Sequence, residues 1–113
     1  MPSIRWLSPM IAVVELDAVH TLATDDFAAV RQLLLDLAER CDRLIVDLSS
    51  TRMLDGAFLG VLAATWARMG RRRSGFMLCG LDEHGTELLR VCQLDRVLTI
   101  APSRRAFLGH PDR

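Results

Sequence analysis

Lysine is absent from the sequence, so all 14 basic residues are arginine. We interpret this first as coding bias in a GC-rich genome and only secondarily as a sign of phosphate binding. The 14 acidic residues bring the formal net charge to zero, and a quarter of the chain is charged, which is ordinary for a soluble globular domain. The charge balance therefore gives no electrostatic argument for binding nucleic acid.

Long hydrophobic runs are missing as well. No apolar run is long enough to cross a membrane, and the first residues lack the basic-then-apolar pattern of an export signal. The three cysteines, Cys41, Cys79 and Cys92, show no CxxC spacing. We expect reduced thiols that serve as small buried hydrophobic residues. These absences favour a cytoplasmic protein that does not insert into a membrane.

The residues that usually carry catalysis or bind metal do not cluster in the sequence. The three histidines, His20, His84 and His110, fall in predicted loops or in the tail, near no ligand set, and no glycine-rich phosphate loop is present. Asp47 and Asp55 are the carboxylates closest to the central turn, and we expect both to cap backbone N–H groups. The sequence therefore predicts neither an enzyme nor a metal or cofactor site.

The length of 113 residues, half of them hydrophobic, predicts a single domain over residues 1–113 with one packed core. Residues 4–7 and 10–16 predict two strands that pair antiparallel through a tight turn at Ser8–Pro9. Beyond Thr24, strand-like and helical patterns alternate, which predicts parallel strands joined by right-handed crossovers. The sequence thus indicates an α/β fold.

The segment from Leu44 to Met69 is predicted to form the central strand, a turn and a helix of the fold. Its first five residues form an apolar run broken only by Asp47, which is typical of a strand buried on both faces. The polar residues Ser49–Arg52 suit a turn, and Asp55 is a favourable N-cap for the helix that follows. The predicted apolar face of that helix comprises Phe58, Leu59, Leu62, Trp66 and Met69. Its free N–H groups make the helix start a natural anion site.

Two further helices are predicted on either side of this segment. Thr24 is expected to cap a helix that ends near Cys41 and packs on the sheet, and Asp82 to cap a short helix after a buried strand over Phe76–Leu81. The triple arginine Arg71–Arg73 follows the central helix. We interpret it as a solvated turn rather than a phosphate site, because cations suit the C-terminal end of a helix.

The central segment resembles the STAS domain, the fold of bacterial anti-sigma factor antagonists and of the cytoplasmic tails of sulfate transporters. The family pattern is a strand ending in Asp-Leu, a short loop, and Asp-Ser-Ser-Gly-Leu-Gly opening a helix. Asp47–Leu48 match the strand end, and Asp55, Leu59 and Gly60 match the first, fifth and sixth positions of the motif. The resemblance extends from Ile11 to Leu108 and implies a mixed, mostly parallel sheet of four to five strands with helices mainly on one side.

Three positions of the motif depart from the family pattern. In phosphorylatable antagonists the second serine accepts phosphate from the anti-sigma factor kinase, and Ala57 stands at the matching position. Gly56 replaces the preceding serine, so neither position bears a hydroxyl and the usual switch cannot operate there. Phe58 replaces a glycine, and it either fills core space or offers a partner an apolar anchor; we favour the core.

The resemblance implies a non-enzymatic interaction module that binds an anti-sigma factor or a related serine kinase. By family position, the partner-binding residues are Ser49, Ser50, Thr51, Asp55, Gly56, Ala57, Phe58 and Gly60. Two alternatives stay open. One is a STAS subunit of a larger assembly, such as a lipid-transport ATPase or a stressosome-like scaffold, and the other is a STAS domain that binds a nucleotide or small anion at the helix start.

Overall fold

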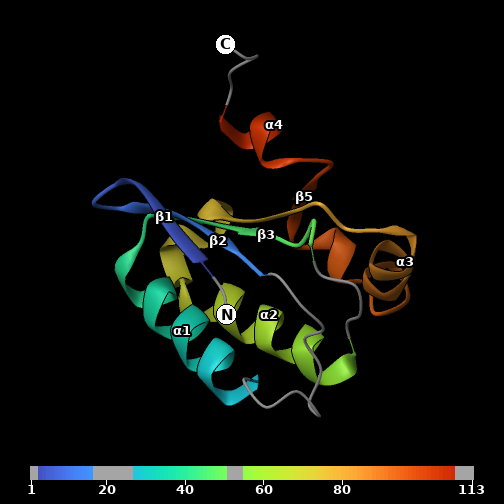
Figure 1. Ribbon diagram of the computed structural model, residues 1–113. Helices are drawn as coiled ribbons and strands as arrows, with labels where there is room; N and C mark the ends of the chain where they lie inside the picture. Colours follow the sequence, from blue (N-terminus) through green and yellow to red (C-terminus); the bar gives the residue numbers. More distant parts are fainter. Residues whose placement is uncertain (1–2, 17–26, 51–54, 109–113) are drawn as a thin grey trace.

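A five-stranded sheet forms the centre of the computed structural model, which describes residues 3–16, 27–50 and 55–108 (Figure 1). The strands are β1 (Ser3–Ser8), β2 (Ile11–Glu15), β3 (Arg43–Asp47), β4 (Phe76–Cys79) and β5 (Thr99–Ala101), which lie in the spatial order β1-β2-β3-β4-β5. β1 pairs antiparallel with β2, and the other neighbouring strands pair parallel. The mixed, mostly parallel sheet and the tight turn after Ser8 confirm the predictions.

The helices lie mainly on one side of this sheet, as predicted. α1 (Phe27–Arg40), α2 (Gly56–Arg68) and α3 (Glu83–Val91) cover one face, whereas the short α4 (Arg104–Leu108) lies over the other (Figure 1). Two 3-10 helices, η1 (Gly70–Gly75) and η2 (Leu94–Arg96), follow α2 and α3. The predicted cap at Thr24 lies outside the described residues, and His84 lies in the first turn of α3 rather than in a loop.

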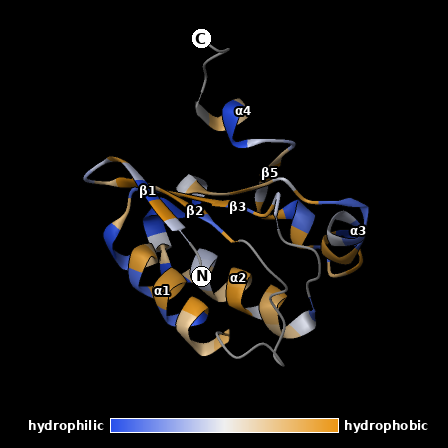
Figure 2. Ribbon diagram, viewed as in Figure 1, coloured by the Kyte–Doolittle hydropathy of each residue, from blue (hydrophilic) through white to orange (hydrophobic). Residues whose placement is uncertain are grey.

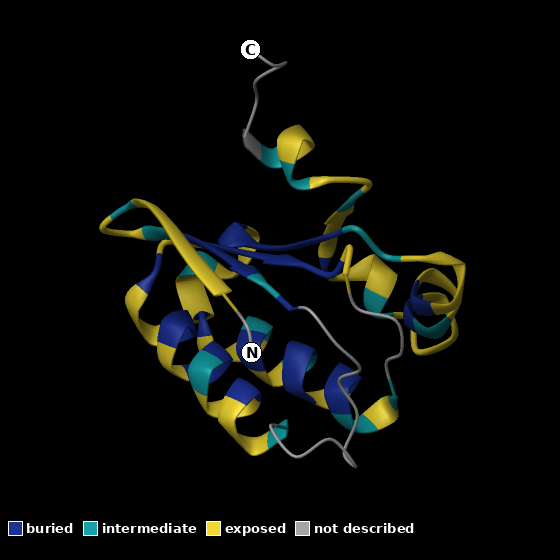
Figure 3. Ribbon diagram, in the orientation of Figure 1, coloured by how far each residue is buried: buried dark blue, intermediate teal, exposed yellow. Residues whose placement is uncertain are grey.

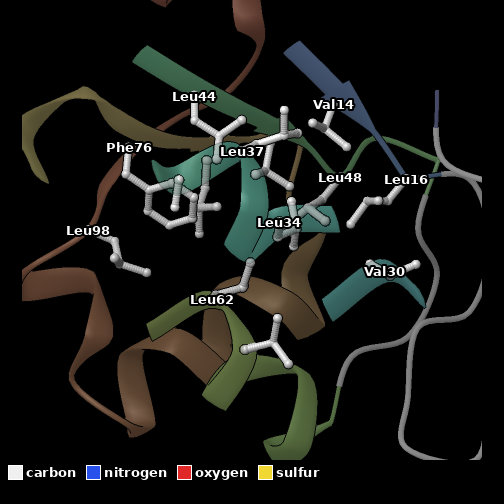
Figure 4. Close-up of a cluster of buried hydrophobic side chains, with 14 of the residues drawn as sticks. Val14, Leu16, Val30, Leu34, Leu37, Leu44, Leu48, Leu62, Phe76 and Leu98 are labelled. Atoms are coloured by element: carbon white, nitrogen blue, oxygen red, sulfur yellow. The ribbon is translucent and has the colours of Figure 1, made fainter. Parts of the chain in front are cut away.

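The main core fills the space between the sheet and the three helices (Figure 4). Hydrophobic residues line the strands and the inward faces of α1 and α2 (Figure 2). The members labelled in Figure 4 are Val14, Leu16, Val30, Leu34, Leu37, Leu44, Leu48, Leu62, Phe76 and Leu98. A second, smaller cluster on the opposite face comprises Val13, Ile45, Met77 and Cys79, against which Phe107 of α4 packs. Both faces of the central strands are therefore covered, which explains their nearly continuous apolar runs.

Trp66 and the arginines that follow α2 have contacts that the sequence did not predict. Trp66 is only half-buried, and the guanidinium of Arg73 stacks over its ring, 4.7 Å from the centroid. Arg72 donates from Nη1 to the carbonyl oxygen of Cys41. The interpretation of Arg71–Arg73 as a solvated turn is therefore wrong for Arg72, whereas Arg71 and Arg73 are exposed to solvent.

The three cysteines occupy two different environments. Cys41 and Cys79 are buried, as predicted, and Cys92 is exposed at the end of α3, where the prediction of a buried residue is wrong. All three are free thiols.

Candidate functional site

The carboxyl ends of β2, β3 and β4 meet at one edge of the sheet, and Asp47 lies at its centre as the last residue of β3. This residue is only 7% exposed. Its Oδ1 accepts hydrogen bonds from the backbone N–H of Ser49, at 2.9 Å, and from the Ser49 hydroxyl. Asp47 therefore closes the turn that begins the loop after β3, as its predicted capping role requires.

Arg104 supplies the positive charge that this buried carboxylate needs. Its Nε lies 3.1 Å from Asp47 Oδ2, and its Nη2 pairs with the carboxylate of Glu15 at the end of β2. Glu15 also accepts a hydrogen bond from Ser3 Oγ at 3.1 Å. One guanidinium from α4 thus joins the ends of two neighbouring strands, beside a pocket of about 220 Å³ whose lining also includes Ser50.

The Cys79 thiol lies on the neighbouring strand and is hydrogen-bonded to Asp47. Burial, together with the adjacent negative charge and hydrogen bond of Asp47, raises the pKa of this thiol to about 12. Cys79 is consequently a neutral thiol at physiological pH and is not suited to act as a nucleophile.

Gly80 brings the loop after β4 against the loop after β3. Its φ is +77°, and a Cβ at this position would lie 2.3 Å from Ser49 Oγ and 2.6 Å from Ser49 N. Only glycine combines this backbone conformation with so close an approach. Gly80 therefore lets Ser49 keep its place beside Asp47.

The start of α2 forms the second part of the candidate site. Asp55 has an extended backbone, and its Oδ1 accepts a hydrogen bond from the N–H of Phe58 at 2.9 Å, which confirms the predicted N-cap. Phe58 is 1% exposed and belongs to the core, as favoured from the sequence. Gly56 and Gly60 are exposed and Ala57 is half-buried, so the outer surface of this helix start consists of small residues (Figure 3).

The residues predicted from the family pattern therefore fall into two groups. Ser49 and Ser50 lie at the sheet edge with Asp47 and Arg104, whereas Asp55 to Gly60 form the first turns of α2. Thr51 lies outside the described residues. Sequence reasoning missed Glu15, Gly80 and Arg104. Glu15 and Gly80 could have been found from the rule that parallel strands end at a common edge of the sheet, because they lie at or directly after the ends of β2 and β4. No sequence pattern indicates Arg104.

Among the residues that the structure describes, no group of three or more His, Cys, Asp or Glu side chains is placed to hold a metal ion. The same residues include no helix of the length and apolarity that a membrane crossing requires. The polar side chains at the sheet edge instead bind one another and fix the loop conformation.

A family model described as "Mlab, STAS domain" matches residues 11–100. The chain belongs to the STAS domain family. A search of curated proteins gave no significant match.

Solved structures of STAS proteins share the fold. An anti-sigma factor antagonist from Mycobacterium paratuberculosis is 20% identical, with a TM-score of 0.81 over 96% of this chain and 90% of its own. A putative anti-sigma factor antagonist from Thermotoga maritima is 14% identical, with a TM-score of 0.84 over 99% and 95%. A STAS domain protein from Planctomyces limnophilus is 18% identical, with a TM-score of 0.79 over 95% and 93%. Identities this low establish the fold alone.

Two glycines of this STAS domain provide a matched test of the loop packing. Gly80→Ala is expected to destabilise the fold by about 1–3 kcal/mol, because it combines an unfavourable positive φ with a clash against Ser49. Gly60→Ala serves as the control, since its Cβ would meet no atom within 4 Å and the position is helical. We expect it to be neutral or to stabilise by up to about 1 kcal/mol. Urea unfolding measures both, and equal free energies of unfolding for the two variants would contradict the packing described.

The cysteines provide a test of the environment of Asp47. At pH 8, iodoacetamide should modify Cys92 in the folded protein and leave Cys79 unmodified, because burial and the raised pKa keep that thiol neutral and inaccessible. Cys79 should react once urea unfolds the chain. Mass spectrometry of peptides after timed quenching gives the rates, and reaction of Cys79 as fast as that of Cys92 in the folded protein would refute this assignment.

Proposed function

We propose that this STAS domain is a non-enzymatic interaction module of the cytoplasm that binds an anti-sigma factor or a related serine kinase. The single observation that carries the proposal is the start of α2, where Asp55 caps the helix and small residues form an exposed surface at the family's partner-binding position. The three free cysteines support a reducing compartment.

The small residues at the helix start are not required by the fold itself. A Cβ at Gly56 or at Gly60 would meet no atom within 4 Å, and neither glycine has a positive φ. Because these two glycines carry no side chain, another protein can approach the helix backbone closely at this point. A core-anchored Phe58 and the Asp55 cap hold this surface rigid, so a partner would meet it without an ordering cost.

The proposed module would lack the usual phosphorylation switch. Ala57 occupies the position of the phosphate-accepting serine, and neither Gly56 nor Phe58 carries a hydroxyl. Since no phosphate can be added at these positions to repel a partner, regulation would rest on abundance, on another modification or on the state of the partner.

The missing hydroxyls favour one second candidate, a STAS subunit of a larger assembly such as a lipid-transport ATPase or a stressosome-like scaffold. A permanent subunit has no need of a switch that releases its partner. Affinity purification from native lysate with mass spectrometry separates the candidates. A small histidine-kinase-like ATPase domain would support the first, and a transporter ATPase the second.

A charge introduced at the helix start tests the proposed surface. Ala57→Asp should leave the free energy of unfolding unchanged or slightly increased, because an acidic residue in the first turn of a helix favours the dipole. It should reduce capture of the purified partner by about tenfold or more, because an unpaired charge is costly to bury in an interface.

The control for this experiment is Ala106→Asp, the same substitution at an exposed position of α4 on the other face of the sheet. It should retain partner binding. A folded Ala57→Asp protein that binds as well as the wild type would place the interface elsewhere and reject the proposal.

A further inference from the structure

A hollow of about 590 Å³ opens at the opposite edge of the sheet, where the parallel strands begin. It lies between the turn that joins β1 to β2, the start of β3 and the 3-10 helix η1. Its lining includes Ser8, Asp42, Arg43, Arg71, Arg72 and Ser74. The hollow is therefore separate from the surface at the start of α2, which lies at the carboxyl edge.

The charges around this hollow are not balanced. Three of its lining residues are arginines, and the one acidic residue among them is Asp42. Other arginines near this edge are engaged: Arg68 forms a 2.7 Å ion pair with Glu39. Arg43 and Arg71, in contrast, form no ion pair within the described parts of the chain. The hollow thus holds two guanidinium groups that form no ion pair with any carboxylate in the described residues.

The backbone fixes the two sides of the hollow at a constant spacing. A Cβ at Gly75 would lie 2.0 Å from the carbonyl oxygen of Asp42, so η1 packs directly against the turn before β3. Arg72 reinforces this contact through its hydrogen bond to the carbonyl oxygen of Cys41. The backbone segments that carry Arg43 and Arg71 are therefore packed against each other on two sides of one opening.

We propose that this hollow binds a phosphate-bearing anion. A guanidinium group presents a planar fork of N–H donors that matches phosphate oxygens, and two such groups provide most of the recognition. The hydroxyl of Ser8 accepts a hydrogen bond from the N–H of Met10 at 3.3 Å, which leaves its own hydrogen available to donate. Ser74 adds a second hydroxyl to the lining. Arg71 thereby gains a binding role that the interpretation of Arg71–Arg73 as a turn did not include.

The test is a calorimetric titration of the intact chain with inorganic pyrophosphate at constant ionic strength. The wild type should give saturable binding, and the double variant Arg43→Gln/Arg71→Gln should bind about tenfold more weakly or worse. The control is Arg31→Gln/Arg96→Gln, which removes the same charge from two exposed positions away from the hollow. Its affinity should stay within about twofold of the wild type, with salt screening equal in all samples.

A second arm distinguishes the source of the phosphate. Sedimentation with phosphatidylglycerol vesicles that depends on Arg43 and Arg71 identifies a lipid headgroup, and pyrophosphate binding without vesicle binding identifies a free phosphate compound. The proposal is rejected if neither probe binds, or if the control variant loses as much affinity as the Arg43→Gln/Arg71→Gln variant. Circular dichroism of both variants verifies that they are folded.

Discussion

The buried carboxylate of Asp47 is the interaction on which the carboxyl edge of this STAS domain depends. A carboxylate that is 7% exposed is stable only when its oxygens are paired, and three segments supply the partners. Ser49 comes from the following loop, Cys79 from the neighbouring strand and Arg104 from α4. The turn at Ser49 that follows β3 and the position of α4 over the second face are consequently coupled through one side chain.

The parallel sheet separates the two ends of the molecule. Its strands end beside the start of α2, where Asp55 caps the N–H of Phe58, and they begin beside η1, where arginines gather. Although the net charge is zero, the two edges therefore differ in character. A protein partner at the start of α2 and an anion at the hollow would occupy the domain together without competing.

Features encoded within a few residues were predictable from the sequence. Asp55 and Asp82 each accept a hydrogen bond from the N–H three residues later, which is a local geometry with a clear sequence pattern. The buried strands were predictable as well, because each is encoded by a short apolar run within its own sequence. Arg104 was not predictable, because its partner Glu15 lies 89 positions away. Helical periodicity likewise does not contain the stacking of Arg73, which comes from η1, over the ring of Trp66.

A double-mutant cycle between Asp47 and Arg104 tests the central claim most directly. Asp47→Asn, Arg104→Gln and the double variant are compared with the wild type by urea unfolding. If the pair holds the edge together, the coupling energy should be about 1–3 kcal/mol, with most of the loss in each single variant arising from the partner left unpaired. Additive effects, with a coupling energy below about 0.3 kcal/mol, would contradict the account.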